Sequence, residues 1–224
     1  MSQFYEYNWP AVSANGIALF QATIANTPLN LNGSSVNKTN GQINFIDFGI
    51  VPRITLNSLQ DISAIKFSIT GYQNGVLINE SPLTGPNNNT VTSVNCFDSI
   101  QSIIASGTTA GGSTVQVGVG STGYFPIVLL NTAKQNTSFI NYALNMVAAT
   151  ANPATYQVFL SLKNNLGMGK YDDLTAAANG NFIAPAVAAT ASQLIQSNSL
   201  AQNLLVRVGP NANGSTLKFQ FLQL

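Results

Sequence analysis

IKFSITGYQNGVLI, residues 65–78, is the stretch that decides the fold of this chain. Its first half, IKFSIT, alternates apolar and polar side chains, the period-two pattern of a strand with one buried face. Asn74-Gly75 then interrupts the run with the dipeptide best suited to positive φ at two successive positions. Because apolar residues return at 76 and 78, the stretch predicts a β-hairpin.

Further strand signals follow directly along the chain. GPNNN at 85–89 predicts a turn, and it is followed by TVTSVNCFDSIQSIIAS at 90–106 and by the alternating valines of STVQVGVG at 113–120. The connections between these segments are too short for a crossover helix. Residues 43–123 are therefore predicted to form the central block of an antiparallel sandwich.

The same signals extend to both ends of the chain. Short strand-like segments recur roughly every ten residues, which predicts one all-β domain over residues 1–224, an antiparallel β-sandwich or jelly roll. Residues 155–162 (TYQVFLSL) predict a strand that pairs with the preceding segment, 138–150, whose own pattern fits a helix or a strand equally well. Apolar alternation at 204–208 and 217–221 predicts a closing hairpin.

Two segments differ from this pattern. Residues 164–203 are predicted to be a long loop with at most one short helix near 186–202, because Ala and Gln favour a helix there while Gly180 and Pro185 limit its extent. The aromatic opening, with Trp9, either packs in the core or belongs to an N-terminal arm, residues 1–15, that lies on a neighbouring subunit. Both the arm and the loop are possible interface segments.

The composition indicates a folded chain that associates with others. Only 7% of its 224 residues are charged, against about 25% in ordinary globular domains. Since 45% of residues are hydrophobic, disorder does not explain this low charge. With a net charge of +1, electrostatic repulsion between copies is weak, and this favours self-association.

Several functions lack the residues that they need. The chain has no histidine, which removes the usual general base and the commonest transition-metal ligand. GVGSTG at 118–123 matches a nucleotide-binding pattern, but YFP follows it where that motif requires a helix, so it is interpreted as a strand end and turn. The basic residues are scattered, which argues against direct nucleic-acid binding.

The carboxylates and the cysteine have plain interpretations. Isolated Asp and Glu residues give no paired acid and base for a glycosidase. Asp172-Asp173 with Thr175 could supply oxygens to calcium, but a solvated loop explains them better. Cys96 is interpreted as a small core residue. No enzyme activity, cofactor or metal site is therefore predicted, and no apolar window reaches the roughly 18 residues of a membrane span.

The central segment also resembles a known group of proteins. A strand ending in TG, a hairpin with acidic Glu80, a TGPN turn (84–87), an aromatic-containing strand and the valine-rich VGVG (117–120) occur here in the order found in β-rich virion proteins of tailed bacteriophages. The opening WPAVSANGIALFQA and the closing LLVRVGPNANGSTLKFQFLQL also resemble the ends of such proteins.

The resemblance implies a structural role in the virion. It favours a capsid-associated decoration or cement subunit, a homotrimer or other homo-oligomer packed on other virion proteins such as the major capsid protein. A tail or baseplate component is the first alternative. A carbohydrate-binding receptor module is the second, because exposed aromatic side chains on a β-sandwich can stack on sugar rings.

Overall fold

The computed structural model describes residues 3–9, 13–37, 39–107, 113–126, 128–129, 140–148, 156–161, 193–199, 203–209 and 217–223. These residues form strands β1 to β15 and one 3-10 turn, η1 (Ile46–Phe48), and every strand pair among them is antiparallel. The predicted all-β, antiparallel sandwich fold is confirmed.

The strands belong to three sheets. Sheet C has the order β3 (Ile43–Asn44), β8 (Ser99–Ser106), β5 (Lys66–Gln73), β6 (Val76–Thr84). Sheet B has the order β10 (Val128–Leu129), β14 (Asn203–Val208), β9 (Thr114–Tyr124), β4 (Val51–Asn57), β7 (Thr90–Cys96), with β12 (Tyr156–Ser161) on β14 and β2 (Ser13–Ala22) on β9. Sheet A has the order β1 (Gln3–Trp9), β15 (Leu217–Gln223), β11 (Ile140–Ala148), β13 (Gln193–Ser199).

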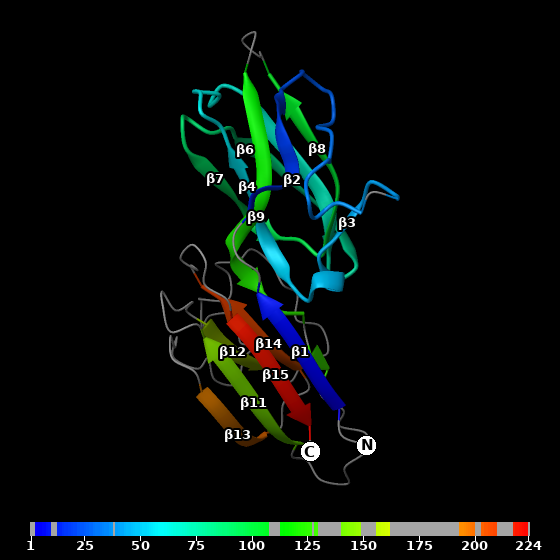
Figure 1. Ribbon diagram of the computed structural model, residues 1–224, viewed down its shortest axis with the longest axis vertical. Helices are drawn as coiled ribbons and strands as arrows, with labels where there is room; N and C mark the ends of the chain where they lie inside the picture. The colour runs from blue at the N-terminus through cyan, green and yellow to red at the C-terminus, as the bar shows by residue number, and fades with distance from the viewer. Residues whose placement is uncertain are drawn as a thin grey trace.

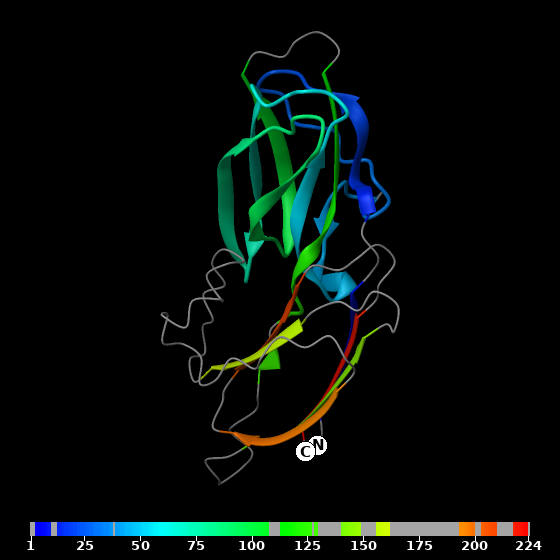
Figure 2. The same cartoon turned by 90° about the vertical axis from the view of Figure 1, so that its left-hand side faces the viewer.

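The sheets build an elongated molecule with two sandwich-like parts (Figure 1). In the upper part, sheet C faces the β2, β9, β4 and β7 portion of sheet B, and in the lower part sheet A lies opposite β12 and β14 (Figure 2). Strand β9 runs from one part into the other, because its last residues, Gly123 and Tyr124, pair with β14. One continuous cluster of buried side chains includes residues of both parts.

The hairpin predicted at 65–78 forms as expected. Phe67 and Ile69 on β5 are buried, and Asn74 and Gly75 have φ of 50° and 72°, the positive values that a tight two-residue turn requires. The valines of β9 at 115, 117 and 119 are buried as their alternation predicted.

Both open sides of the upper sandwich are closed by the chain itself. On one side the segment at 26–35 covers two strands: the Leu29 amide donates to the Ile103 carbonyl of β8 (2.8 Å), and the Gly33 amide donates to the Ile17 carbonyl of β2 (2.9 Å). On the other side, the Glu80 carboxylate of β6 accepts from the amides of Val94 and Asn95 on β7, at 2.7 and 2.8 Å. These hydrogen bonds cover strand edges of the upper sandwich that another chain could otherwise extend.

Trp9 packs in the core of its own chain, where the two parts meet. Its side chain is 1% exposed and makes an edge-to-face contact with Phe125, with ring centroids 5.8 Å apart. Strand β1, which carries Trp9, pairs along its whole length with β15. The core interpretation of this tryptophan is confirmed.

Three element predictions were wrong. Residues 193–199, within the predicted helix at 186–202, form strand β13, because β11 pairs with this backbone and its Ser and Asn residues are poor helix formers. The strands of the predicted closing hairpin exist, but β14 belongs to sheet B and β15 to sheet A. Strand β12 pairs with β14 and not with β11. Alternation identifies a strand and its buried face, but not its partner.

Candidate functional site

The glycines of GVGSTG lie inside strand β9, between β2 and β4, and no helix follows them among the described residues. A Cβ atom on Gly118 would lie 2.0 Å from the Ser13 carbonyl oxygen, and one on Gly123 would lie 2.3 Å from the Val51 carbonyl oxygen. These glycines therefore allow close packing of neighbouring backbones. The predicted strand end is confirmed, because all six residues of the motif lie in the last part of β9, but the predicted turn is wrong.

The described carboxylates do not converge. Glu80 joins two sheet edges, Asp61 accepts from the amide and the hydroxyl of Ser63, and Asp98 lies in the β7–β8 turn. Within the described ranges, no group of three or more His, Cys, Asp or Glu side chains could hold a metal ion. The calcium candidates Asp172, Asp173 and Thr175 lie outside those ranges.

Asp98 is the most buried of these carboxylates, with 8% of its surface exposed. Its Oδ2 accepts from the Gly75 amide at 3.2 Å, while its Oδ1 is buried without a hydrogen-bond partner. Burial raises the pKa of this carboxyl above its ordinary value, and backbone hydrogen bonds from Gly75 and Asn74 oppose the shift. The residue ties the β5–β6 turn to the β7–β8 turn through its hydrogen bond with Gly75.

Cys96 is a buried core residue, as its sequence context predicted. Its side chain is fully buried, and burial raises the pKa of its thiol far above the ordinary value. The thiolate that metal binding or nucleophilic attack requires is therefore suppressed.

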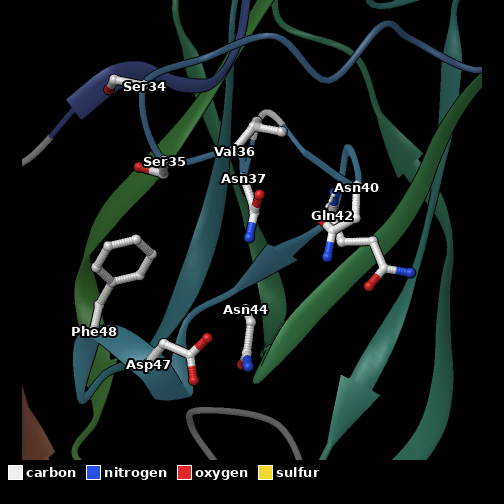
Figure 3. Close-up of a pocket in the computed structure, with 9 residues that line it drawn as sticks. All are labelled: Ser34, Ser35, Val36, Asn37, Asn40, Gln42, Asn44, Asp47 and Phe48. Carbon is white, nitrogen blue, oxygen red and sulfur yellow. Dashed lines mark hydrogen bonds between the residues drawn. The ribbon is translucent and has the colours of Figure 1, made fainter.

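A polar hollow of about 340 Å³ opens on the surface of the upper sandwich, beside β3 and the 3-10 turn. Figure 3 shows its lining side chains: Ser34, Ser35, Val36, Asn37, Asn40, Gln42, Asn44, Asp47 and Phe48. Four of the nine carry amide groups, one carries a carboxylate and one is an exposed aromatic ring. This hollow is the candidate functional site of the described part of the chain.

The local turns of the chain place these side chains. The amide carbonyl of Asn37 accepts from the Thr39 backbone amide (2.9 Å), and that of Asn40 accepts from the Gln42 amide (3.0 Å). Asn44 makes the same kind of turn with Ile46 at 3.2 Å. These are Asx turns, in which a side chain closes its own loop, and they hold the three asparagines in fixed orientations.

The 3-10 turn supplies the remaining groups. Asp47 and Phe48 lie on η1, which ends at Gly49 in the left-handed region. The Phe48 ring is 54% exposed, an unusual amount for an aromatic side chain, and Asp47 lies beside it on the wall of the hollow (Figure 3). None of the described lining residues is basic.

A smaller hollow of about 200 Å³ adjoins the first and shares Gln42 and Asn44 with it. Its other polar groups include Tyr72 and Gln101, whose side chains share a hydrogen bond at 3.4 Å. The two hollows together give a polar surface with an aromatic residue in each, Phe48 in one and Tyr72 in the other.

This site was not predicted from the sequence. The asparagines and glutamine at 37–44 stand in a segment rich in turn formers, where such residues are expected anyway. The one feature of the sequence that points to the site is the concentration of amide side chains shortly before Asp47-Phe48. Only the backbone path of 34–48 brings them around one hollow.

Exposed apolar side chains form a second surface feature. Leu19 and Phe20 on β2 and Ile24 just beyond it are 45%, 44% and 61% exposed. Val76 and Leu77, at the tip of the β5–β6 hairpin, are 63% and 56% exposed. The alternation predicted to resume at Val76 therefore does not bury that residue, because the start of β6 lies at the hairpin tip and on the sheet edge.

Comparison with family models and with curated proteins gives no family for this chain. No family model matches the chain, and no curated protein is significantly similar to it. In the part of the chain that the structure describes, no helix is long and apolar enough to cross a membrane.

Proposed function

We propose that this chain is a structural protein of a tailed-bacteriophage virion, a capsid-associated decoration or cement subunit that stabilises the head by protein–protein packing. It associates with its own copies, as a trimer or another homo-oligomer, and with other virion proteins such as the major capsid protein. The resemblance of the central segment to β-rich virion proteins supports this class of function.

The observation that carries the proposal is the exposure of large apolar side chains on a chain with 7% charged residues. Leu19, Phe20 and Ile24 lie close together in sequence on one strand and its continuation, and Val76 with Leu77 provides a second such pair. Exposed apolar groups of this kind are typical of association surfaces. Standard protein interfaces bury about 1,600 Å² in total, and burying these side chains would contribute to such an area.

The closed sides of the upper sandwich support association through side chains and not through extension of the sheets. Because segment 26–35 and Glu80 cover the outer edges of β2 and β7, copies do not extend each other's sheets there. Contacts instead use outward side chains and loop tips. This mode suits a subunit that is added to a finished shell and must not polymerise in solution.

Cryo-electron microscopy of intact particles tests the proposal. We expect density for this fold at many equivalent positions on the head, in clusters related by local symmetry. Density confined to the tail or to one vertex would favour the alternative, a tail or baseplate component. Purified particles that lack this chain altogether would overturn both.

A further inference from the structure

We propose that the polar hollow formed by residues 34–48 binds a neutral saccharide. This proposal goes beyond the structural role above and does not depend on it. It rests on the chemistry of the lining side chains. They include hydrogen-bond donors, a carboxylate acceptor and an exposed aromatic ring, and the described fold needs none of these groups for its own hydrogen bonds or core.

The donors are carboxamide NH2 groups. In Asn37, Asn40 and Asn44 the side-chain oxygen is already bonded to a backbone amide, so each side chain is held in place with its NH2 group left to donate. No described group accepts from these NH2 groups. Because the orientation of these side chains is fixed before a ligand arrives, binding would cost little side-chain entropy.

The acceptor is Asp47. Its carboxylate lies on the wall of the hollow beside Asn44 and Phe48 (Figure 3), and most of the other lining groups are amides and hydroxyls. Sugar hydroxyls donate and accept at the same time, so a surface of NH2 donors beside a carboxylate matches them on both counts. A phosphate or sulfate would be repelled by Asp47 and finds no basic partner among the described lining residues.

Phe48 supplies the apolar element. With 54% of its surface exposed, its ring offers a flat face to the solvent beside the polar groups. The C–H faces of a pyranose ring are apolar, and stacking them on an aromatic ring removes both surfaces from water. The adjoining hollow of about 200 Å³ shares Gln42 and Asn44 with the first and adds Tyr72 and Gln101, so polar groups and a second aromatic side chain continue beside the site.

The size of the hollow is compatible with this class of ligand. Small-molecule sites have volumes of roughly 300–1,000 Å³, and the hollow of about 340 Å³ lies at the lower end of that range. A shallow site of this kind binds weakly, and we expect a dissociation constant of about 1 mM for a single sugar unit.

Saturation-transfer-difference NMR on the full chain tests the proposal, with methyl glucoside, methyl galactoside, methyl mannoside, N-acetylglucosamine, rhamnose and maltose as probes. We expect transfer to at least one of them, and titration of that sugar should show affinity lowered about tenfold in Phe48→Ala and in Asp47→Asn, in line with loss of one charged hydrogen bond or one stacking contact. Leu59→Ala removes a side chain that is 73% exposed and lies outside both hollows, so it should bind as wild type does.

Two results would overturn the proposal. The first is the absence of transfer to any sugar in the panel, with all variants shown by thermal unfolding to be folded. The second is binding that Phe48→Ala and Asp47→Asn leave unchanged, or that is tighter for glucose 6-phosphate than for the neutral sugars. Neither result bears on the virion role, which is tested separately by the position of the chain in particles.

Discussion

At the scale of the residue, the raised pKa of the Asp98 carboxyl makes the stability of the fold depend on pH. Because burial raises the pKa of this carboxyl above its ordinary value of 3.8, the folded chain keeps the proton to a higher pH than the unfolded chain does. The contribution of Asp98 to the free energy of unfolding is therefore complete at low pH. It is lost as the pH rises from 3.8 through the raised folded value.

Asp98→Asn should remove this pH dependence, since the amide oxygen can still accept from Gly75 but does not ionise. We expect the free energy of unfolding of Asp98→Asn, measured in urea relative to wild type, to increase between about pH 4 and about pH 7. Asp61→Asn is the matched control. Hydrogen bonds from Ser63 lower the pKa of Asp61, so its contribution is lost only as the pH falls below 3.8, and between about pH 4 and about pH 7 the difference between this variant and wild type should stay nearly constant. Parallel pH profiles for wild type and Asp98→Asn would contradict the account.

At the scale of the element, Glu80 joins the outer strands of the two upper sheets. One carboxylate oxygen accepts from the Val94 amide and the other from the Asn95 amide. Glu80→Gln keeps one acceptor oxygen and loses the other together with the charge. We expect it to lower the free energy of unfolding by about 1–2 kcal/mol, because hydrogen bonds to charged groups contribute more than neutral ones.

Chemical denaturation measures this effect, with Glu6→Gln as the control. Glu6 is an exposed residue of β1 whose carboxylate accepts from the Gln220 side chain at 2.8 Å, and surface pairs of this kind contribute about 0–1 kcal/mol. If Glu80→Gln costs no more than Glu6→Gln, the two sheet edges are not joined as described.

Elements are also the scale at which sequence and structure can be compared. The hairpin at 65–78 and the valines of β9 follow from alternation and from Asn74-Gly75, because burial of one face and turn geometry are local properties. The partners of β12, β14 and β15 do not follow, since alternation is the same whichever strand lies alongside. The polar hollow was missed for a related reason. Its amides are ordinary turn residues until the backbone of 34–48 brings them around one space.

At the scale of the whole molecule, the chain combines a continuous buried core with a surface poor in charge. Core side chains run from the upper sandwich, through Trp9 where the two parts meet, to β14 in the lower part. The predicted single domain over residues 1–224 stays a prediction, as do the virion location and the oligomeric state.

Sedimentation velocity of the purified chain at micromolar concentration tests the central claim, that this surface is made for association. We expect a species heavier than the 23.6 kDa of one chain, with a mass that falls in the variant Leu19→Ser/Phe20→Ser as apolar contact is removed. A single 23.6 kDa species for wild type, unchanged in the variant and across concentrations, would contradict it.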